Sequence, residues 1–385
     1  MNVSLHSGSS PGPGNGEFGR FFLPGPTEVR PEVLRALQRP MIGHRGPDMK
    51  ELLSGVDSGL RTLFGTERPV FISTSSATGF METAIVNLCA RRTLCVIGGA
   101  FAERFHKIAA RCGRAADVLE VEWGEPNTAD SVRRALAASP GGYDLVTVVH
   151  SETSTGVLNP IRDITSAVHE FEDVLVAVDG VSSLAGAELY FDDWNLDFLL
   201  TGSQKALALP PGLAFAAASE RALDRARGIS QRSYYFDLVD FDRQAREHQT
   251  ANTPAVSLLY ALDVQLRRIA AEGLRQRWAR HADMAARTYT WVDQMRETTG
   301  AEFRVLAREG YRSPTVSAVV LPDELTGPQV TAALGERGFT IAPGYGPTKN
   351  DIIRIGHMGD HTLAELEVLL GALTDVLTYA LAAPA

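Results

Sequence analysis

Cysteines, basic clusters and long apolar runs are scarce in this sequence, and each shortage excludes a class of protein. The three cysteines, Cys89, Cys95 and Cys112, form no Cys-x-x-Cys pair, which argues against a disulfide framework or a zinc knuckle and indicates a reducing compartment. The formal net charge of −9, without a basic cluster, argues against nucleic acid or an acidic membrane as a partner. No apolar stretch approaches the roughly 20 residues of a membrane-spanning helix.

The first 19 residues form a separate segment by composition. Eleven of them are Gly, Ser or Pro, and they lack the continuous apolar segment of a signal peptide. Such a composition is typical of a flexible tail, so residues 1–19 are predicted to lie outside the fold. The remaining chain has an ordinary globular composition, with 44% hydrophobic and 22% charged residues overall. A cytoplasmic location is expected.

Short apolar runs that alternate with amphipathic segments predict an α/β fold with a mainly parallel sheet. The runs lack the polar alternation of half-exposed strands, as expected for strands covered on both faces. Helical patterns cover 49–65 and 102–113. The runs are residues 93–99, 144–150, 174–180, 197–203 and 213–219. In such folds ligands bind beyond the carboxyl ends of the strands, so the residues after each run are the candidates for chemistry.

After about residue 254 the pattern changes, which predicts a second domain. Along the chain, short strand candidates follow two long helical patterns and precede a final helix that carries a leucine stripe. The helical patterns are 254–273 and 275–297, the strand candidates are 315–322, 338–344 and 351–359, and the stripe is Leu363, Leu366, Leu370, Leu373 and Leu377. We expect a large domain over residues 20–261, with the segment at about 20–40 packing on the small domain, and a smaller α+β domain over 262–385.

Two strand ends place an acid and a lysine at the same edge of the predicted sheet. Asp179 closes an apolar strand, where a carboxylate needs a cation or a donor, although a helix cap or a surface ion pair is the commoner explanation for a lone aspartate. Lys205 follows the next strand, in a turn of small residues that precedes two prolines and a glycine. The two groups either form a salt bridge or hold the two ends of a flat cationic ring.

A third junction, Ser75–Gly79, lies between a strand and a helix. Backbone N–H groups, hydroxyls and the helix dipole form an anion cradle there, with simple N-capping as the alternative. No P-loop, no G-x-G-x-x-G after a strand and no H-E-x-x-H motif occurs, and no metal site is expected. A phosphate cradle, a carboxylate for a ring nitrogen and a lysine for an aldehyde are the parts that pyridoxal phosphate needs.

These junctions lie within a resemblance that runs from about Phe22 to the last helix. The chain resembles the class V aminotransferases, and within them it is most similar to the alanine/serine–glyoxylate branch. The matching segments are 22–37, 75–88, 98–105, 150–161, 178–189, 192–215 and 352–359, of which 152–160 and 202–214 are the most specific. The resemblance implies fold type I, covalently bound pyridoxal phosphate, and a homodimer with shared active sites. It also implies ping-pong transfer of an amino group from a small amino acid to glyoxylate or pyruvate.

The resemblance implies cofactor roles for ten positions. Lys205 matches the Schiff-base lysine and Asp179 matches the partner of the pyridine nitrogen. The other matches are Ser76, Ala77 and Thr78 in the phosphate turn, Phe101 as the stacking ring, Thr153 near the phenolic oxygen, Gln204 beside the lysine, and Thr250 and Thr253 in the phosphate site of the neighbouring subunit. Relatives usually carry glycine in the phosphate turn, so the alanine at position 77 requires a negative φ there.

Substrate roles follow from the same resemblance. Arg354 matches the arginine whose fork of donors binds the substrate α-carboxylate, whereas an isolated arginine in a strand is more often part of an ion pair. Gly25 and Gly43 match backbone that approaches the substrate closely. For His44 and Arg45 we expect structural contacts, with a second anion-binding role for Arg45 as the alternative.

The same residues bear on whether the chain catalyses another reaction on this scaffold. Cysteine desulfurases need a mobile cysteine late in the chain, and all three cysteines precede residue 113, which argues against that activity. A lyase-type reaction stays open, because one cofactor supports several reactions. A non-catalytic relative that binds the cofactor also stays open, since fold alone does not determine function. The presence of both Lys205 and Arg354 favours catalysis.

Overall fold

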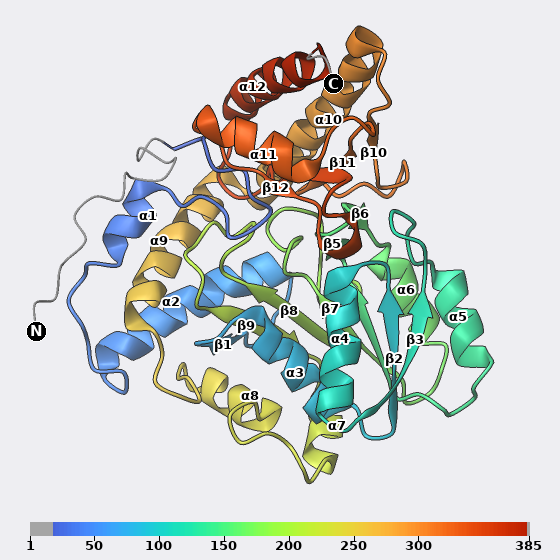
Figure 1. Cartoon of the computed structure of the whole chain (residues 1–385). Helices are drawn as coiled ribbons and strands as arrows, with labels where there is room; N and C mark the ends of the chain where they lie inside the picture. Colours follow the sequence, from blue (N-terminus) through green and yellow to red (C-terminus); the bar gives the residue numbers. More distant parts are fainter. Residues whose placement is uncertain (1–17, 383–385) are drawn as a thin grey trace, which may run out of the picture.

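The computed structural model describes residues 18–382, which fold around a seven-stranded sheet (Figure 1). The strands from β8 to β3 are parallel, and β9 runs antiparallel to both of its neighbours. In spatial order they are β1 (Phe71–Ser73), β9 (Ala214–Ala218), β8 (Phe198–Gly202), β7 (Leu175–Asp179), β4 (Leu145–Val149), β2 (Arg92–Ile97) and β3 (Ala115–Glu120). Each of the five predicted runs contains one of these strands, so the mainly parallel α/β fold is confirmed.

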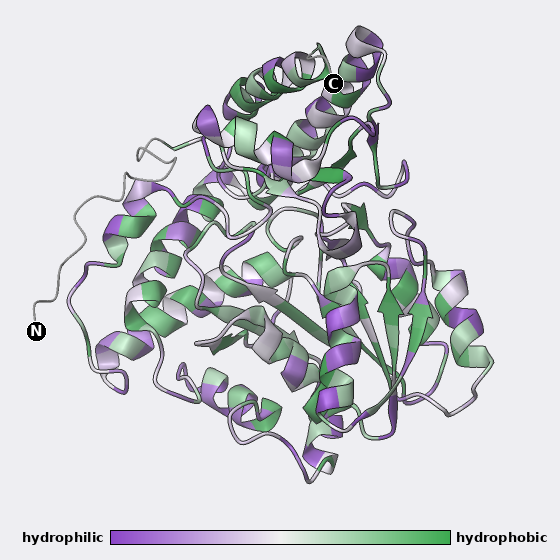
Figure 2. Ribbon diagram, viewed as in Figure 1, coloured by the Kyte–Doolittle hydropathy of each residue, from purple (hydrophilic) through white to green (hydrophobic). Residues whose placement is uncertain are grey.

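Helices cover both faces of this sheet, and successive residues of one strand enter different cores. Leu199 of β8 belongs to one apolar cluster, while Phe198 and Leu200 belong to the other, as the two-residue repeat of a strand requires. Figure 2 shows the strands coloured mainly as hydrophobic. One face carries α2 (Pro47–Phe64), α5 (Ala129–Ala137), α6 (Ile161–Val168) and α9 (Val256–Glu272); the other carries α3 (Ala77–Leu88), α4 (Ala100–Arg111), α7 (Glu220–Gly228) and α8 (Leu238–Arg246).

A second sheet of four antiparallel strands lies above the first in Figure 1. Its order is β10 (Arg304–Val305), β11 (Ser317–Val320), β13 (Ile352–Ile355) and β12 (Ala342–Pro343), with η1 (Gly346–Thr348) between the last two in sequence. It packs with α10 (Leu274–Thr299), α11 (Gly327–Glu336) and α12 (Leu363–Ala382) in a third apolar cluster. The three predicted strand candidates and the final helix are present, and four leucines of the stripe are buried while Leu363 is exposed.

The N-terminal segment joins the two parts. Phe22 belongs to the third cluster, and Phe21 forms an isolated β-bridge with Thr340. Helix α1 (Pro31–Ala36) packs on α9. The division at residue 262 stays a prediction. It falls inside α9, and the clusters change later, between Ile269 and Met284.

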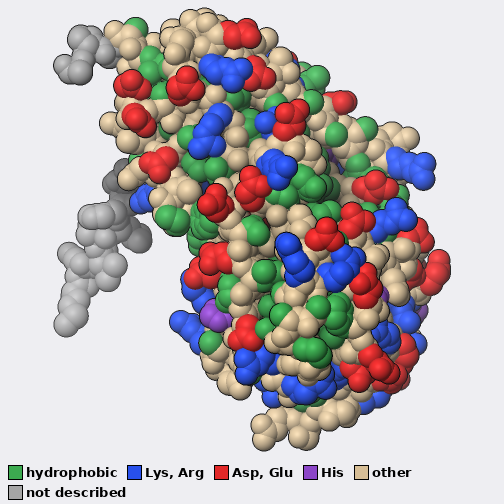
Figure 3. Space-filling model, turned by 90° about the vertical axis from the view of Figure 1, so that its right-hand side faces the viewer, with side chains coloured by type: hydrophobic (Ala, Val, Ile, Leu, Met, Phe, Trp, Pro, Cys, Tyr) green, Lys and Arg blue, Asp and Glu red, His purple; other side chains and the backbone are tan. Residues whose placement is uncertain are grey.

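Most of the predicted tail, residues 1–17, lies outside the described residues, as do residues 383–385. Phe18 is described and belongs to the fold, because its ring lies 3.5 Å from the Arg30 guanidinium carbon. No helix within residues 18–382 is long and apolar enough to cross a membrane. On the face shown in Figure 3, basic and acidic side chains are mixed.

Candidate active site

A cavity of about 100 Å³ lies at the edge of the large sheet where its parallel strands end. Its lining comes from the ends of β4 and β7, the segments after them and after β8, and the first turns of α3 and α4. Eight of the thirteen sequence-predicted site residues line it: Ser76, Ala77, Thr78, Phe101, Thr153, Asp179, Gln204 and Lys205. The other lining residues are Met81, Arg104, Val149, Ser151, Val181 and Ser182. The cavity therefore lies where the strand-end rule places ligands.

Lys205 and Asp179 are both almost fully buried in this cavity, with exposed fractions of 6% and 5%. The Lys205 Nζ donates a hydrogen bond to the Pro24 carbonyl oxygen, and the Asp179 Oδ1 accepts one from the Val181 backbone N–H at 2.7 Å. The two side chains thus bond to different backbone groups, and within the described residues no ion pair joins them.

Burial disfavours the charged form of both groups and so shifts their pKa values in opposite directions. It lowers the pKa of Lys205 to about 7, helped by the nearby positive charge of Arg354, while Asp179 and Glu152 oppose the shift. It raises the pKa of Asp179 to about 6, against the hydrogen bond from Val181. A lysine with this pKa is partly a neutral amine near pH 7 and can attack an aldehyde. A protonated pyridine nitrogen is the cation that would restore the charged form of Asp179.

The phosphate turn also fits the cofactor. Helix α3 starts at Ala77, and its N-cap residue Ser76 makes no side-chain capping hydrogen bond. No acidic residue lies in the first turn, so the N–H groups of the helix end have no side-chain acceptor from the cap or the first turn and suit a phosphate. Ala77 is not among the described residues with positive φ, which confirms the negative φ that was predicted for it.

Of the six cavity residues that the sequence analysis missed, Arg104 and Ser182 contact predicted site residues. Arg104 of α4 donates to the Thr78 hydroxyl at 3.2 Å, and its guanidinium carbon lies 5.0 Å from the Phe101 ring centroid. The spacing of three residues from Phe101 puts both on one helix face, a signal that could have found it. Ser182 pairs with the Thr153 hydroxyl at 2.5 Å, and it has no comparable signal in the sequence.

The four-stranded sheet brings Arg354 to the same place. Arg354 lies on β13 with 7% of its surface exposed, and it donates to the Thr153 carbonyl oxygen at 3.3 Å and to the Pro343 carbonyl oxygen at 3.0 Å. The Tyr345 ring, which the sequence analysis also missed, lies between Arg354 and Phe101, at 5.6 Å from the guanidinium carbon and 5.4 Å from the phenyl centroid. Both Arg354 and Tyr345 therefore adjoin the cavity.

The N-terminal segment closes over the lysine at Gly25. A Cβ atom on Gly25 would lie 2.4 Å from the Lys205 Cδ and 2.7 Å from its Nζ. The φ of Gly25 is +102°, which L side chains rarely adopt. Contact with Lys205 therefore requires glycine at this position, and the predicted approach of the Gly25 backbone to the substrate stays a prediction.

Three predicted residues are not brought to the cavity by this chain. Thr250 is buried, and its hydroxyl donates to the Asn252 carbonyl oxygen at 2.7 Å, whereas Thr253 is exposed. A Cβ on Gly43 would meet no atom within 4 Å. Arg45 makes the structural contacts expected of it, donating to the Gln249 side chain at 2.9 Å and to the Thr250 carbonyl oxygen at 3.2 Å. Because Thr250 and Thr253 are assigned to a neighbouring subunit, their roles stay predictions.

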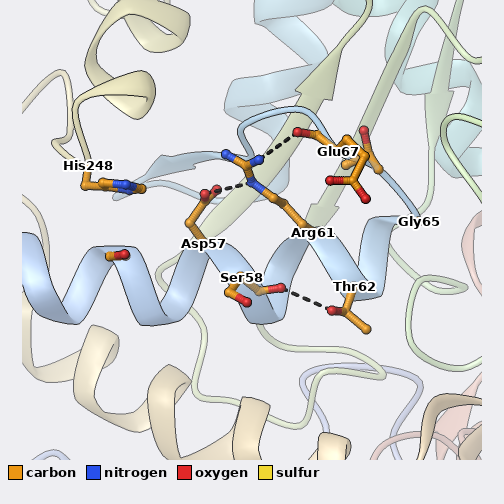
Figure 4. Close-up of a pocket in the computed structure, with 9 residues that line it drawn as sticks. Asp57, Ser58, Arg61, Thr62, Gly65, Glu67 and His248 are labelled. Atoms are coloured by element: carbon orange, nitrogen blue, oxygen red, sulfur yellow. Dashed lines mark hydrogen bonds and ion pairs between the residues drawn. The ribbon is translucent and has the colours of Figure 1, made fainter.

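A larger surface pocket, of about 630 Å³, lies along α2 (Figure 4). Two of its charged groups are paired with each other, since Arg61 donates to Asp57 at 2.8 Å. Arg61 also donates to the Glu67 carbonyl oxygen at 2.6 Å, and Asp57 accepts from the Val70 N–H at 3.2 Å. Size alone does not identify an active site, whereas buried groups with shifted pKa values in one cavity do. We therefore assign the candidate site to the smaller cavity.

Comparisons with known proteins agree with this geometry. The family model for aminotransferase class-V matches residues 24–346. An uncharacterized aminotransferase of Methanocaldococcus jannaschii is 38% identical over 357 residues, covering 91% of this chain and 89% of the relative. A serine–glyoxylate aminotransferase of Methylorubrum extorquens is 32% identical over 364 residues, covering 92% and 89%.

A solved structure supports the same assignment at the level of the fold. The aspartate aminotransferase of Thermus thermophilus, of subgroup IV, superposes with a TM-score of 0.84 at 33% identity, covering 94% of this chain and 99% of that one. Since the family match extends over most of the chain and the relatives cover it nearly end to end, this protein belongs to the class V aminotransferases, which are pyridoxal-phosphate-dependent transaminases of fold type I.

Proposed function

We propose that the enzyme transfers the amino group of a small amino acid, of the alanine or serine type, to glyoxylate or pyruvate. The observation that carries the proposal is the convergence of Lys205, Asp179 and Arg354, from three distant parts of the chain, around one small buried cavity. Relatives named for serine–glyoxylate and alanine–glyoxylate transfer support the choice of substrates.

The residues that would hold the cofactor are divided between its two ends. The N–H groups at the start of α3, the Thr78 hydroxyl and the Arg104 guanidinium suit the phosphate. At the other end, the Asp179 carboxylate would hold a proton on the ring nitrogen, and Phe101 would pack on the ring face. When bound, pyridoxal phosphate supplies an aldehyde that condenses with amines and a ring that takes up the electron pair left by a removed Cα proton.

Arg354 and Lys205 act on the substrate. The Arg354 fork binds the α-carboxylate and so fixes the Cα–H bond relative to Lys205. Lys205 takes the proton from Cα and returns one, because a pKa of about 7 lets the same amine accept and donate near neutral pH. The burial of both side chains excludes water from the proton transfer.

The proposed assembly is a cytoplasmic homodimer in which Thr250 and Thr253 of each subunit serve the site of the other. Neither Thr250 nor Thr253 lines the cavity of its own chain, which supports this assembly. The exposed apolar side chains of Met41 and Tyr234 also support it. The three free cysteines fit a reducing compartment. Light scattering tests the assembly, with an expected mass twice the 41.6 kDa of one chain; a monomer that is fully active would contradict it.

Transfer of labelled nitrogen tests the reaction. We expect ¹⁵N-alanine or ¹⁵N-serine with glyoxylate to yield ¹⁵N-glycine, at rates that give parallel double-reciprocal lines. The Lys205→Ala variant should give no labelled glycine and no cofactor trapped on protein by borohydride. Release of labelled ammonia in place of glycine would favour the lyase alternative. Bound cofactor without turnover of any donor would favour the non-catalytic one.

A further inference from the structure

Glu152 is a buried carboxylate beside the site to which no role has yet been given. It lies on β5 (Ser151–Glu152), which pairs with β6 (Val157–Leu158), and 1% of its surface is exposed. Its carboxylate accepts hydrogen bonds from the backbone N–H groups of Phe101 at 3.2 Å and Ala102 at 2.9 Å. It also accepts from the Ser154 N–H at 3.0 Å and the Ser154 hydroxyl at 2.6 Å.

These contacts form a helix cap supplied from another part of the chain. The N-cap residue of α4 is Gly99, which has no side chain for capping. The Ser154 hydroxyl accepts from the Ala100 N–H at 3.1 Å, so Ser154 and Glu152 together satisfy the first three N–H groups of the helix. A Cβ on Gly99 would lie 2.4 Å from the Ser154 Oγ and 2.5 Å from the Glu152 Cγ. Glycine at position 99 makes room for the cap.

The cap holds the part of α4 that faces the cavity. Phe101, the second residue of the helix, has its ring centroid 5.6 Å from the Lys205 Nζ. One turn later, Arg104 reaches Thr78 in the phosphate turn. Any movement of the helix start therefore displaces a ring and a cation of the site together.

We propose that Glu152 is a positioning residue for cofactor binding, which through α4 holds Phe101 over the cofactor ring and places a negative charge beside Lys205. The inference rests on the proposed function, since it needs a cofactor in the cavity. The charged groups that act on Lys205 are Arg354, Asp179, Glu152 and Arg104. Burial is the largest influence on the Lys205 pKa, and the Glu152 charge raises it against that burial.

Four variants separate the cap from the charge. Glu152→Gln keeps an acceptor oxygen and loses the charge, Glu152→Ala loses both, and Ser154→Ala loses part of the cap only. Glu103→Gln is the matched control, because Glu103 lies in the first turn of the same helix, pairs with Lys107 at 2.6 Å and does not line the cavity.

The readouts are the dissociation constant of pyridoxal phosphate from the apoprotein and the pH midpoint of the visible absorbance of the bound cofactor. We expect Glu152→Ala to weaken binding by about tenfold or more and both Glu152 variants to lower the pH midpoint by about one unit, since a removed negative charge disfavours protonation nearby. Ser154→Ala should weaken binding without the pH shift, and Glu103→Gln should change neither. If Glu152→Ala does not fold, Glu152→Gln carries the test.

A double-mutant cycle checks that Glu152 acts through the ring. If Glu152 acts through Phe101, the Phe101→Ala/Glu152→Ala variant should lose less affinity than the product of the two single fold-losses. We expect the difference to be at least about fivefold. Unchanged affinity and pH midpoint in both Glu152 variants, with only a lower melting temperature, would reduce Glu152 to a structural cap and overturn the inference. Wild-type protein that traps no cofactor with borohydride would instead overturn the proposed function, so the two failures are distinguishable.

Discussion

The Gly25→Ala substitution tests directly whether Lys205 is the reacting group. A Cβ at position 25 would lie 2.4 Å from the Lys205 Cδ, 2.5 Å from its Cε and 2.7 Å from its Nζ. The lysine is buried in a small cavity and cannot swing into solvent. The added methyl group must therefore push the end of Lys205 from its present place.

The size of the effect follows from these distances. Non-bonded carbon atoms rest about 3.5–4.0 Å apart, so a contact of 2.4 Å requires a displacement of at least about 1 Å. A misplacement of about 1 Å costs on the order of 10²-fold in rate, which equals about 2.7 kcal/mol of activation free energy. The positive φ of Gly25 adds strain to the folded state, of about 1–3 kcal/mol for alanine.

A second glycine separates strain from displacement. Gly113 also has a positive φ, +68°, but a Cβ there would meet no atom within 4 Å. We expect both Gly25→Ala and Gly113→Ala to unfold at lower urea concentration than the wild type. Only Gly25→Ala should lower kcat, by about 10²-fold. A kcat for Gly25→Ala within threefold of that for Gly113→Ala would refute the placement of Lys205 at the reaction centre.

Three further outcomes are expected. Asp179→Asn should still trap the cofactor on Lys205 but lower kcat by at least about 10²-fold in steady-state assays, because an amide does not hold the ring proton. Arg354→Lys should raise KM for amino acids by about tenfold with little change in melting temperature, since it keeps the charge and loses the bidentate fork; an unchanged KM would argue against the carboxylate contact. Burial lowers the pKa values of His150 and His361 to about 3 and of His357 to about 4. The unfolded chain binds these protons near pH 6.5, so the free energy of unfolding should fall as the pH drops below that value, by up to about 1.4 kcal/mol per pH unit for each histidine. The urea midpoint should therefore be lower at pH 5 than at pH 7. Equal midpoints would contradict the burial of neutral rings.

The central strands of the sheet were predictable because helices cover both of their faces, and such strands carry continuous apolar runs. The strand β3 escaped prediction because it lies at the edge of the sheet and none of its residues is fully buried. Its sequence, Ala115–Glu120, carries no apolar run. An edge strand has a neighbouring strand on one side only and is less deeply buried, so the continuous apolar run that identifies central strands is missing there.

The site was predictable where chemistry stands at the end of a strand or follows a family pattern, as for Asp179 and Lys205. It was not predictable where the structure joins distant segments. Glu152 caps a helix whose N–H groups lie about 50 positions earlier in the chain, and no spacing in the sequence reports such a contact. Helical spacing from Phe101 reports Arg104 only after Phe101 itself has been assigned.

The directions of the two central pKa shifts favour one of the alternatives that the sequence left open for Lys205 and Asp179. In a salt bridge each charge stabilises the other, so the lysine pKa rises and the aspartate pKa falls. Here the attraction between the two groups acts in that sense but is outweighed by burial, and the lysine pKa falls to about 7 while the aspartate pKa rises to about 6. A buried acid and a buried base that both approach their neutral forms are each short of a partner. A protonated pyridine aldehyde would meet both needs, because its aldehyde condenses with an amine and its ring nitrogen supplies a cation for a carboxylate.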